Sequence, residues 1–242
     1  MGSHADWAGL VHDHFKDYHN ILADLPGHGS SKLSGHENFP ACANDLFHQL
    51  TRAGIDRLSI VGYSMGGRFG LHFQKRYPCH IDSLVGLSTG PGLRSEEERQ
   101  KRVRSDEALI QEMQTIGMKA FLIKWYASPL FQCMNNNSEL LKRLIRERRQ
   151  NDPSQLQQSL GLLGNGALYS IWEHLPSMEL PVLLLSGELD SKYNRINEEM
   201  LALLPRGQHT IIEQGDHAFH LEKPLETAIL IRNFLRNLNK GE

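Results

Sequence analysis

The strongest structural signal in the chain is the hexapeptide Gly62-Tyr63-Ser64-Met65-Gly66-Gly67. It follows an apolar run, Leu58 to Gly62, and precedes a segment of helical character. A serine between glycines at this junction matches G-x-S-x-G, the sharp strand-to-helix turn that exposes a nucleophilic hydroxyl. Only small residues fit on either side of such a turn. The alternative is an incidental Gly/Ser turn, which the strand before it and the helix after it disfavour.

Short apolar runs rich in β-branched residues recur on both sides of this turn. Each is followed by turn residues and then by helical sequence, which is typical of a mostly parallel sheet with helices on both faces. The pattern predicts an α/β fold. The predicted strands are Ile21 to Leu25, Leu58 to Gly62, Ser83 to Leu87, Val182 to Ser186 and Thr210 to Ile212.

The alternation breaks between Gly90 and Met178, where helical character dominates and no strand is predicted. Pro129 and Pro153 interrupt this stretch. We interpret the chain as a single α/β domain, 1–242, with residues 90–178 inserted as a helical cap. The predicted cap helices are Ser95 to Met113, Met118 to Tyr126, Ser138 to Arg149 and Ser154 to Leu163.

Composition excludes several classes of protein. Hydrophobic residues make up 40% of the 242 and charged residues 22%, which supports a buried core and argues against disorder. A net charge of −2 gives no general attraction for nucleic acid or acidic membranes, and the apolar runs are too short to span a bilayer. Three scattered cysteines, Cys42, Cys79 and Cys133, form no disulfide framework and favour a cytoplasmic location.

A nucleophilic serine of this kind needs a histidine and an acid, and the chain supplies both in the order Ser, Asp, His. His217 stands out among 13 histidines because it follows the last predicted strand; any other histidine is more simply interpreted as a surface or core residue. Asp190 follows the preceding strand. Glu188 and, less well, Asp216 are alternative acids. We prefer Asp190 because it lies further into its loop, where its side chain can turn back toward His217.

One further loop makes the chain resemble a known superfamily. Asp24-Leu25-Pro26-Gly27-His28-Gly29-Ser30-Ser31 matches D-x-P-G-x-G-x-S, a recurrent loop of α/β-hydrolases. The serine turn and the acid and histidine loops follow in the order of that superfamily. The resemblance implies the α/β-hydrolase fold. We interpret Asp24 and His28 as hydrogen-bonding residues of the loop.

The fold alone does not determine the function, because this superfamily hosts many reactions. Arg68 follows Ser64 by one helical turn, so both project from one face of the helix. A guanidinium group so close to the nucleophile suits a substrate that carries a carboxylate, which it binds bidentately. We therefore expect a small anionic substrate.

More specifically, the chain is similar to the 2-succinyl-6-hydroxy-2,4-cyclohexadiene-1-carboxylate synthases of menaquinone biosynthesis, from about His4 to its end. Their G-Y-S-x-G-G-R turn matches Gly62 to Arg68. Their P-G-L turn, R-x-R-S-D helix and W-Y pair match Pro91 to Leu93, Arg102 to Asp106, and Trp125-Tyr126.

This resemblance implies the roles of the site residues. The triad would be Ser64, Asp190 and His217, and Met65 would supply an oxyanion-hole N–H. The remaining expected residues are three carboxylate-binding arginines and two pocket walls: Arg68, Arg102, Arg148, Tyr63 and Trp125. From the sequence alone, Arg102 would be a solvated residue, because it lies among other basic residues of a charged helix. Arg148 lies beside Arg146 and Arg149, so a neighbouring arginine is the alternative to it.

The implied reaction is a carbon–oxygen lyase reaction, the elimination of pyruvate from 2-succinyl-5-enolpyruvyl-6-hydroxy-3-cyclohexene-1-carboxylate. His217 would act as the base through Ser64, and Asp190 would fix its tautomer. We see no metal-ligand spacing and expect neither a metal nor a cofactor. One alternative is a serine hydrolase of small carboxylate esters or C–C bonds, and the other is an inactive, N-terminally truncated copy.

The start of the chain motivates the idea of truncation. The family opens with a strand and H-G-F-x-G-S, followed by a tryptophan, and Met1-Gly2-Ser3 with Trp7 aligns with the end of that loop. We expect the N-terminal strands and the oxyanion donor after His-Gly to be missing. The lost strand would lie between Ile21 to Leu25 and Leu58 to Gly62. The competing interpretation is that Met-Gly-Ser-His is a cloning remnant.

Overall fold

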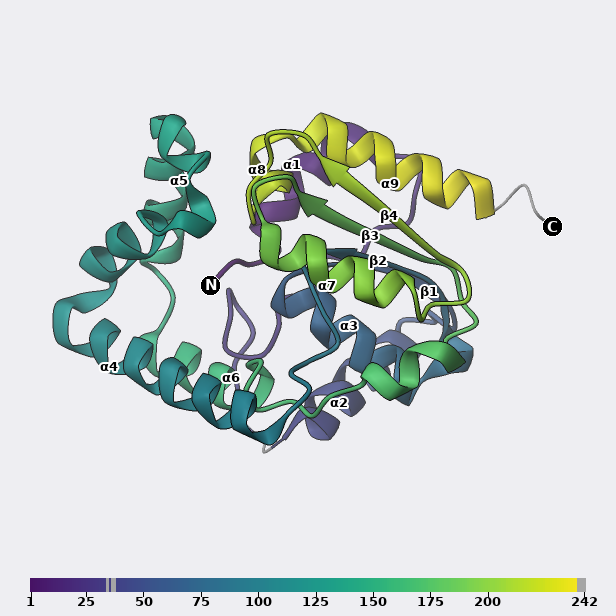
Figure 1. Cartoon of the computed structure of the whole chain (residues 1–242), viewed down its shortest axis with the longest axis horizontal. Helices are drawn as coiled ribbons and strands as arrows, with labels where there is room; N and C mark the ends of the chain where they lie inside the picture. Colours follow the sequence, from purple (N-terminus) through teal and green to yellow (C-terminus); the bar gives the residue numbers. More distant parts are fainter. Residues whose placement is uncertain (34, 36–37, 239–242) are drawn as a thin grey trace.

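A computed structural model describes residues 1–33, 35 and 38–238 of the chain. Its centre is a parallel four-stranded sheet in the order β1-β2-β3-β4 (Figure 1). Parallel strands end at the same edge, so the loops that follow them converge there. The strands are β1 Leu58–Tyr63, β2 Ile81–Leu87, β3 Val182–Gly187 and β4 Gly207–Ile212.

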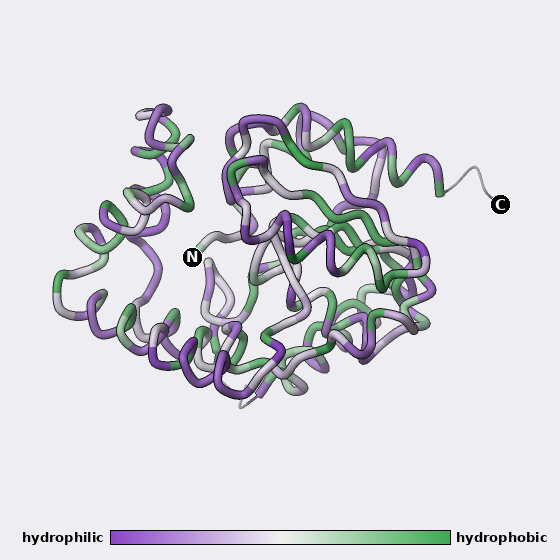
Figure 2. Tube along the Cα trace, in the orientation of Figure 1, coloured by the Kyte–Doolittle hydropathy of each residue, from purple (hydrophilic) through white to green (hydrophobic). Residues whose placement is uncertain are grey.

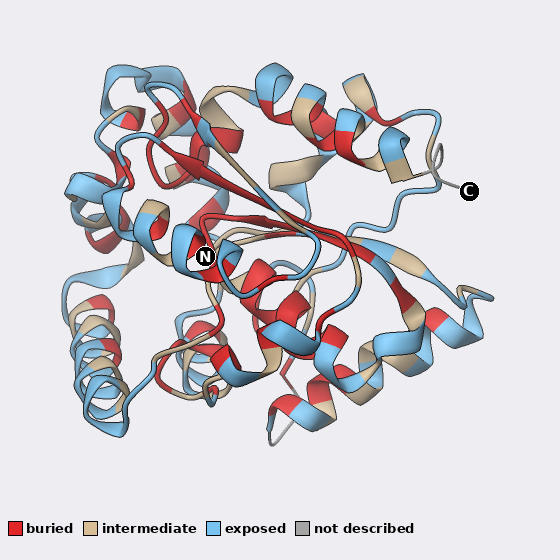
Figure 3. Cartoon of the chain, turned by 45° about the vertical axis from the view of Figure 1, so that its right-hand side comes forward, coloured by how far each residue is buried: buried red, intermediate tan, exposed pale blue. Residues whose placement is uncertain are grey.

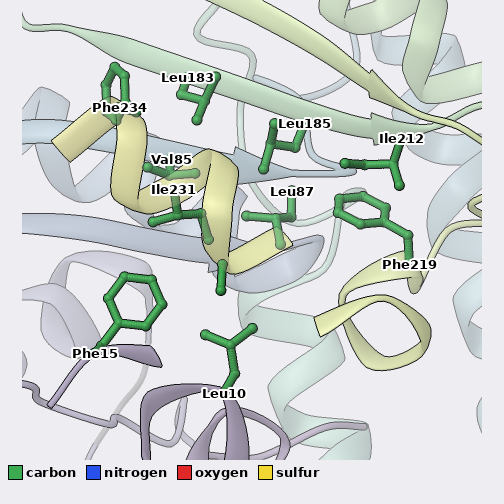
Figure 4. Packing of buried hydrophobic residues seen from close by; sticks show 11 residues of the cluster. Leu10, Phe15, Val85, Leu87, Leu183, Leu185, Ile212, Phe219, Ile231 and Phe234 are labelled. Atoms are coloured by element: carbon green, nitrogen blue, oxygen red, sulfur yellow. The ribbon is translucent and has the colours of Figure 1, made fainter. Parts of the chain in front are cut away.

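Helices cover both faces of the sheet, so its central strands are buried (Figure 3). On one face, α1 (Ala5–His14), the single turn α8 (Phe219–Glu222) and α9 (Pro224–Leu238) pack on alternate strand residues such as Val85 and Leu185 (Figure 4). On the other, α3 (Met65–Arg76) and α7 (Ser191–Leu201) pack on Leu84 and Leu184. Hydrophobic segments accordingly gather along the sheet (Figure 2). The helix α2 (Phe39–Arg52) packs outside α3.

We call residues 90–178, the segment between β2 and β3, the cap. It contains α4 (Glu96–Tyr126), α5 (Ser138–Arg148) and α6 (Pro153–Leu163), and the strands point toward it (Figure 1). Helix α4 starts with a capping box between Ser95 and Glu98 and is interrupted at Gly117, whose φ is 78° and ψ is 157°. The interruption separates the two helices predicted from the sequence. Short 3-10 turns occur at Pro78–His80, Pro129–Phe131, Met134–Asn136 and Trp172–Ser177.

The strand predicted for Ile21 to Leu25 is wrong. Within the described residues this segment pairs with no strand, and the side chains of Ile21 and Leu22 are 48% and 39% exposed. An apolar run becomes a strand only where a neighbour completes its hydrogen bonds. Instead β1 is the edge strand, with Val61 36% exposed. In the described part of the chain, no helix has the length and apolar character that a membrane span requires.

Candidate active site

Ser64 lies at the junction of β1 and α3 in a strained backbone conformation, with φ 49° and ψ −107°. The junction is too tight for side chains on its flanks. A Cβ atom on Gly62 would lie 2.6 Å from the carbonyl carbon of Gly66, and one on Gly67 would lie 2.7 Å from the oxygen of Gly62. The Ser64 N–H donates to the Leu87 carbonyl at 2.8 Å. Gly62 and Gly67 therefore have the steric role expected of glycines in this turn. Gly66 does not, because a Cβ atom there would meet nothing within 4 Å.

Three side chains from three strand-end loops form a hydrogen-bonded chain. His217 Nε2 lies 3.2 Å from Ser64 Oγ, and His217 Nδ1 lies 2.7 Å from Asp190 Oδ2. Asp190 also caps α7 by accepting the Tyr193 N–H at 3.4 Å, which holds the carboxylate in the loop. With Nδ1–H donated to the carboxylate, Nε2 carries the lone pair and can accept the serine proton.

The other two acids considered from the sequence lie in different environments. The Glu188 carboxylate accepts the backbone N–H of Gln214 at 2.8 Å. Asp216 accepts the backbone N–H groups of Ala218 at 2.8 Å and Cys133 at 3.2 Å. In the described structure, Asp190 is thus the acid of these three that hydrogen-bonds the His217 ring.

The three predicted arginines line one cavity with Ser64 and His217, and the cavity has a volume of about 1380 Å³. It continues past the site along the open edge of β1, so the substrate pocket is only part of it. Arg68 extends from the first turn of α3, Arg102 from α4 and Arg148 from the end of α5. Arg148 is buried while its neighbours Arg146 and Arg149 are exposed, so this helix presents the expected residue to the cavity.

Each arginine is held by one side-chain acceptor. Arg68 Nε donates to Asn165 Oδ1 at 3.3 Å, Arg102 Nε to Asp106 Oδ1 at 2.7 Å, and Arg148 Nη2 to Asp6 Oδ2 at 2.8 Å. Sequence reasoning missed all three acceptors. The i, i+4 spacing of Arg102 and Asp106 is a signal that could have revealed the second. The other two acceptors are distant along the chain and left no signal.

Two of these guanidinium groups have unused hydrogen-bonding capacity. The Nη1 atoms of Arg68 and Arg148 are buried and have no partner among the described residues. Burial lowers the pKa of Arg68 and raises the pKa of Asp106. Buried charged donors without acceptors are costly, so an anion in the cavity would be stabilising.

The predicted walls Tyr63 and Trp125 line the same cavity. The Tyr63 ring lies 4.3 Å from the His220 ring and 5.3 Å from the His217 ring, centroid to centroid. Burial holds the pKa of Tyr63 well above its ordinary value and lowers that of His220 to about 3, so both are neutral at pH 7. His220 was not predicted, and it adds an uncharged wall behind Tyr63.

The predicted oxyanion donor, Met65, is the first residue of α3. Backbone N–H groups in the first turn of a helix have no intrahelical acceptor, and the helix dipole favours negative charge there. The Met65 N–H therefore belongs to a group of donors suited to an anion beside Ser64.

The loop at Asp24 has the structural role that we expected. Its carboxylate accepts the N–H groups of His4 at 2.7 Å and Ser30 at 3.0 Å. His28 Nδ1 lies 3.3 Å from the Ser159 hydroxyl of α6, and burial lowers the His28 pKa to about 3. The loop thus connects the core to the cap.

Cys133, Asp216 and Glu222 form a cluster that no sequence motif indicates, with potential ligand atoms within 4.8 Å of one another. Burial raises the pKa of Asp216, and burial together with Asp216 raises that of Glu222 to about 8. At neutral pH the two carboxyl groups are therefore a proton-sharing pair rather than two free carboxylates.

Comparison with known proteins agrees with this geometry. The α/β hydrolase fold model matches residues 1–224. A protein of Bacillus subtilis (strain 168), provisionally named 2-succinyl-6-hydroxy-2,4-cyclohexadiene-1-carboxylate synthase, is 31% identical over 98% of this chain and 88% of its own. The chain belongs to this synthase family of α/β-hydrolases.

Other members of the synthase family are also similar over most of their length. The 2-succinyl-6-hydroxy-2,4-cyclohexadiene-1-carboxylate synthase of Escherichia coli O1:K1 / APEC is 27% identical over 93% of this chain and 87% of its own. The structure of MenH from S. aureus superimposes with a TM-score of 0.92 at 28% identity, covering 98% of this chain and 90% of that one. Both the α/β-hydrolase fold and the family resemblance predicted from the sequence are confirmed.

Proposed function

We propose that the chain is a lyase that eliminates pyruvate from 2-succinyl-5-enolpyruvyl-6-hydroxy-3-cyclohexene-1-carboxylate, forming 2-succinyl-6-hydroxy-2,4-cyclohexadiene-1-carboxylate. One observation supports it above all others: Ser64 and His217 line the same cavity as Arg68, Arg102 and Arg148. The substrate carries enolpyruvyl, succinyl and ring carboxylates, hence three anionic groups. Three guanidinium groups are suited to bind them through charge-assisted hydrogen bonds.

The proposed reaction is a proton abstraction followed by elimination. His217 Nε2 takes the Ser64 proton, and the serine oxygen removes the ring proton beside the succinyl ketone. The resulting enolate oxygen is stabilised by N–H groups at the start of α3, that of Met65 among them. The electrons then form the second ring double bond as the bond to the enolpyruvyl oxygen breaks. The departing enolate takes up a proton and becomes pyruvate.

Asp190 and the arginines have distinct roles in this proposal. Asp190, 2.7 Å from Nδ1, fixes the tautomer of His217 and stabilises its protonated form. The arginines orient the substrate through its carboxylates, and Tyr63 and Trp125 pack against the ring. The reaction is an elimination with no net redox change, so the proposal includes no cofactor. We also propose a cytoplasmic location, which fits the three cysteines, Cys42, Cys79 and Cys133, being free thiols.

The decisive experiment measures pyruvate release from the enolpyruvyl precursor through a coupled lactate dehydrogenase assay. Ser64→Ala should reduce kcat by about 10⁴-fold or more without unfolding the protein. Activity within tenfold of the parent would contradict the assignment of Ser64. Turnover of short acyl esters without pyruvate release would instead favour the serine hydrolase, and inactivity in both assays would favour an inactive copy.

A further inference from the structure

The three arginines of the cavity differ in how far their charge is compensated. Arg102 donates to the carboxylate of Asp106 and Arg148 to that of Asp6. Arg68, one helical turn from Ser64, donates instead to the neutral amide oxygen of Asn165. The arginine that follows Ser64 by one helical turn is therefore the one with an uncharged hydrogen-bonding partner.

A tight turn between α6 and the cap's last 3-10 helix presents Asn165. A Cβ atom on Gly164 would lie 2.2 Å from the Leu160 oxygen, and one on Gly166 would lie 2.8 Å from Val103 Cγ2 of α4. The flanking glycines thus let the turn lie close against α6 and α4. Asn165 itself is only 8% exposed and lines the cavity. This packing fixes the position of its amide.

In the part of the chain that the structure describes, the titratable groups that face Arg68 come from three helices. Helix α4 contributes Arg102 and Asp106, whose charges act on Arg68 in opposite directions. Helix α7 contributes Tyr193, and α3 contributes His72, which burial keeps neutral by lowering its pKa to about 3. Since Asp106 is hydrogen-bonded to Arg102, these surroundings leave the positive charge of Arg68 largely uncompensated.

We propose that Asn165 is a positioning and specificity-determining residue for carboxylate substrates. Its oxygen orients the Arg68 guanidinium by accepting from Nε, and its neutrality leaves the charge available to the carboxylate that binds nearest to Ser64. The buried, unpartnered Nη1 of Arg68 supplies a donor for that carboxylate. This inference rests on the anion-binding part of the proposed function.

The test separates charge from shape by measuring binding rather than turnover. The probes are 4-oxo-4-phenylbutanoate, which carries one carboxylate, and its neutral amide, both titrated by calorimetry. Asn165→Asp keeps the acceptor and the size but adds a charge. It should weaken binding of the acid by about 10- to 100-fold and leave the amide almost unaffected. Asn165→Ala removes the acceptor and should weaken binding of the acid by a smaller factor.

Asn136→Asp is the matched control, because it adds the same charge at an exposed position of the cap. It should bind both probes as the parent does. If Asn165→Asp weakened binding of the acid and of the amide equally, the role of Asn165 would be structural and the inference would be overturned. A parent protein that binds the acid no more tightly than the amide would also overturn it. If the binding pattern holds but no pyruvate is released, the proposed reaction fails and the role of Asn165 stands.

Discussion

The backbone N–H of His217 donates to the carbonyl oxygen of Leu130 at 3.2 Å, so the cap is hydrogen-bonded directly to the histidine of the triad. A second bond lies beside it, from the Cys133 N–H to the Asp216 carboxylate. Both link the segment of 3-10 turns between α4 and α5 to the loop after β4. The position of His217 relative to Ser64 therefore depends on the position of the cap on the core.

We expect Asp216→Ala to loosen this connection, because it removes the acceptor of the Cys133 and Ala218 N–H groups. The free energy of unfolding should fall by about 1–3 kcal/mol. Small displacement of His217 should also lower kcat, by up to about 10²-fold. Urea unfolding and pyruvate release measure the two effects. Glu213→Ala, at an exposed position of the same loop, is the control, and equal effects in both variants would contradict the prediction.

Glu222 makes stability depend on pH. Burial and the neighbouring Asp216 raise its pKa from 4.5 to about 8 in the folded state. The folded protein thus holds the proton more tightly than the unfolded chain, so stability falls as pH rises from about 4.5 to about 8. Glu222→Gln should flatten this part of the profile, whereas Glu226→Gln, at an exposed position, should not. Denaturant midpoints across this pH range test it.

Replacement of the cavity arginines should impair substrate use far more than replacement of their neighbours. Arg68→Ala, Arg102→Ala and Arg148→Ala each remove a charge-assisted contact, which is worth about 1.5–3 kcal/mol of transition-state binding. The controls are Arg99→Ala, a residue paired with Glu96 outside this cavity, and the exposed Arg146→Ala. Losses of kcat/KM as large in the controls would mean that other faces of these helices bind the substrate.

Arg148 should also matter for stability. Its ion pair with Asp6 is almost fully buried, with side chains 7% and 9% exposed. Arg148→Ala leaves the buried Asp6 carboxylate without its ion-pair partner. The free energy of unfolding should fall by about 3–5 kcal/mol. The double variant Asp6→Asn/Arg148→Ala should recover part of this loss in urea unfolding. No recovery would mean that the cost comes from lost packing, not from an unpaired charge.

Two adjacent glycines of the serine turn should respond in opposite ways to alanine. A Cβ atom on Gly67 would clash with the Gly62 oxygen at 2.7 Å and with Thr89, so Gly67→Ala should destabilise by about 1–3 kcal/mol or more. A Cβ atom on Gly66 meets nothing within 4 Å. Gly66→Ala should therefore be neutral or stabilise α3 by up to about 1 kcal/mol. Thermal unfolding of the two variants tests the contrast.

The features predicted best from the sequence are those that depend on residues close together in the chain. The serine turn, Asp190 and His217 each follow a strand directly, so short-range patterns were enough to place them. Arg148 needed the family resemblance, because a charged helix alone does not show which of its arginines faces inward. Asn165 and Asp6 were missed because their contacts with Arg68 and Arg148 join distant segments. Apolar character alone misled the prediction for residues 21–25, since strand formation depends on a neighbouring strand that a local pattern does not reveal.

The route of the chain through the cap has a consequence for how substrate preference can change. The triad residues leave the sheet after β1, β3 and β4, whereas two of the three arginines belong to helices between β2 and β3, which are neighbours. In the proposed function, the reacting side chains and two of the three carboxylate-binding arginines thus lie in separate stretches of the chain. We therefore expect that residues 90–178 can diverge, or be grafted from a relative, without changes to the catalytic loops. Any graft must preserve the carbonyl of Leu130, which accepts the His217 N–H.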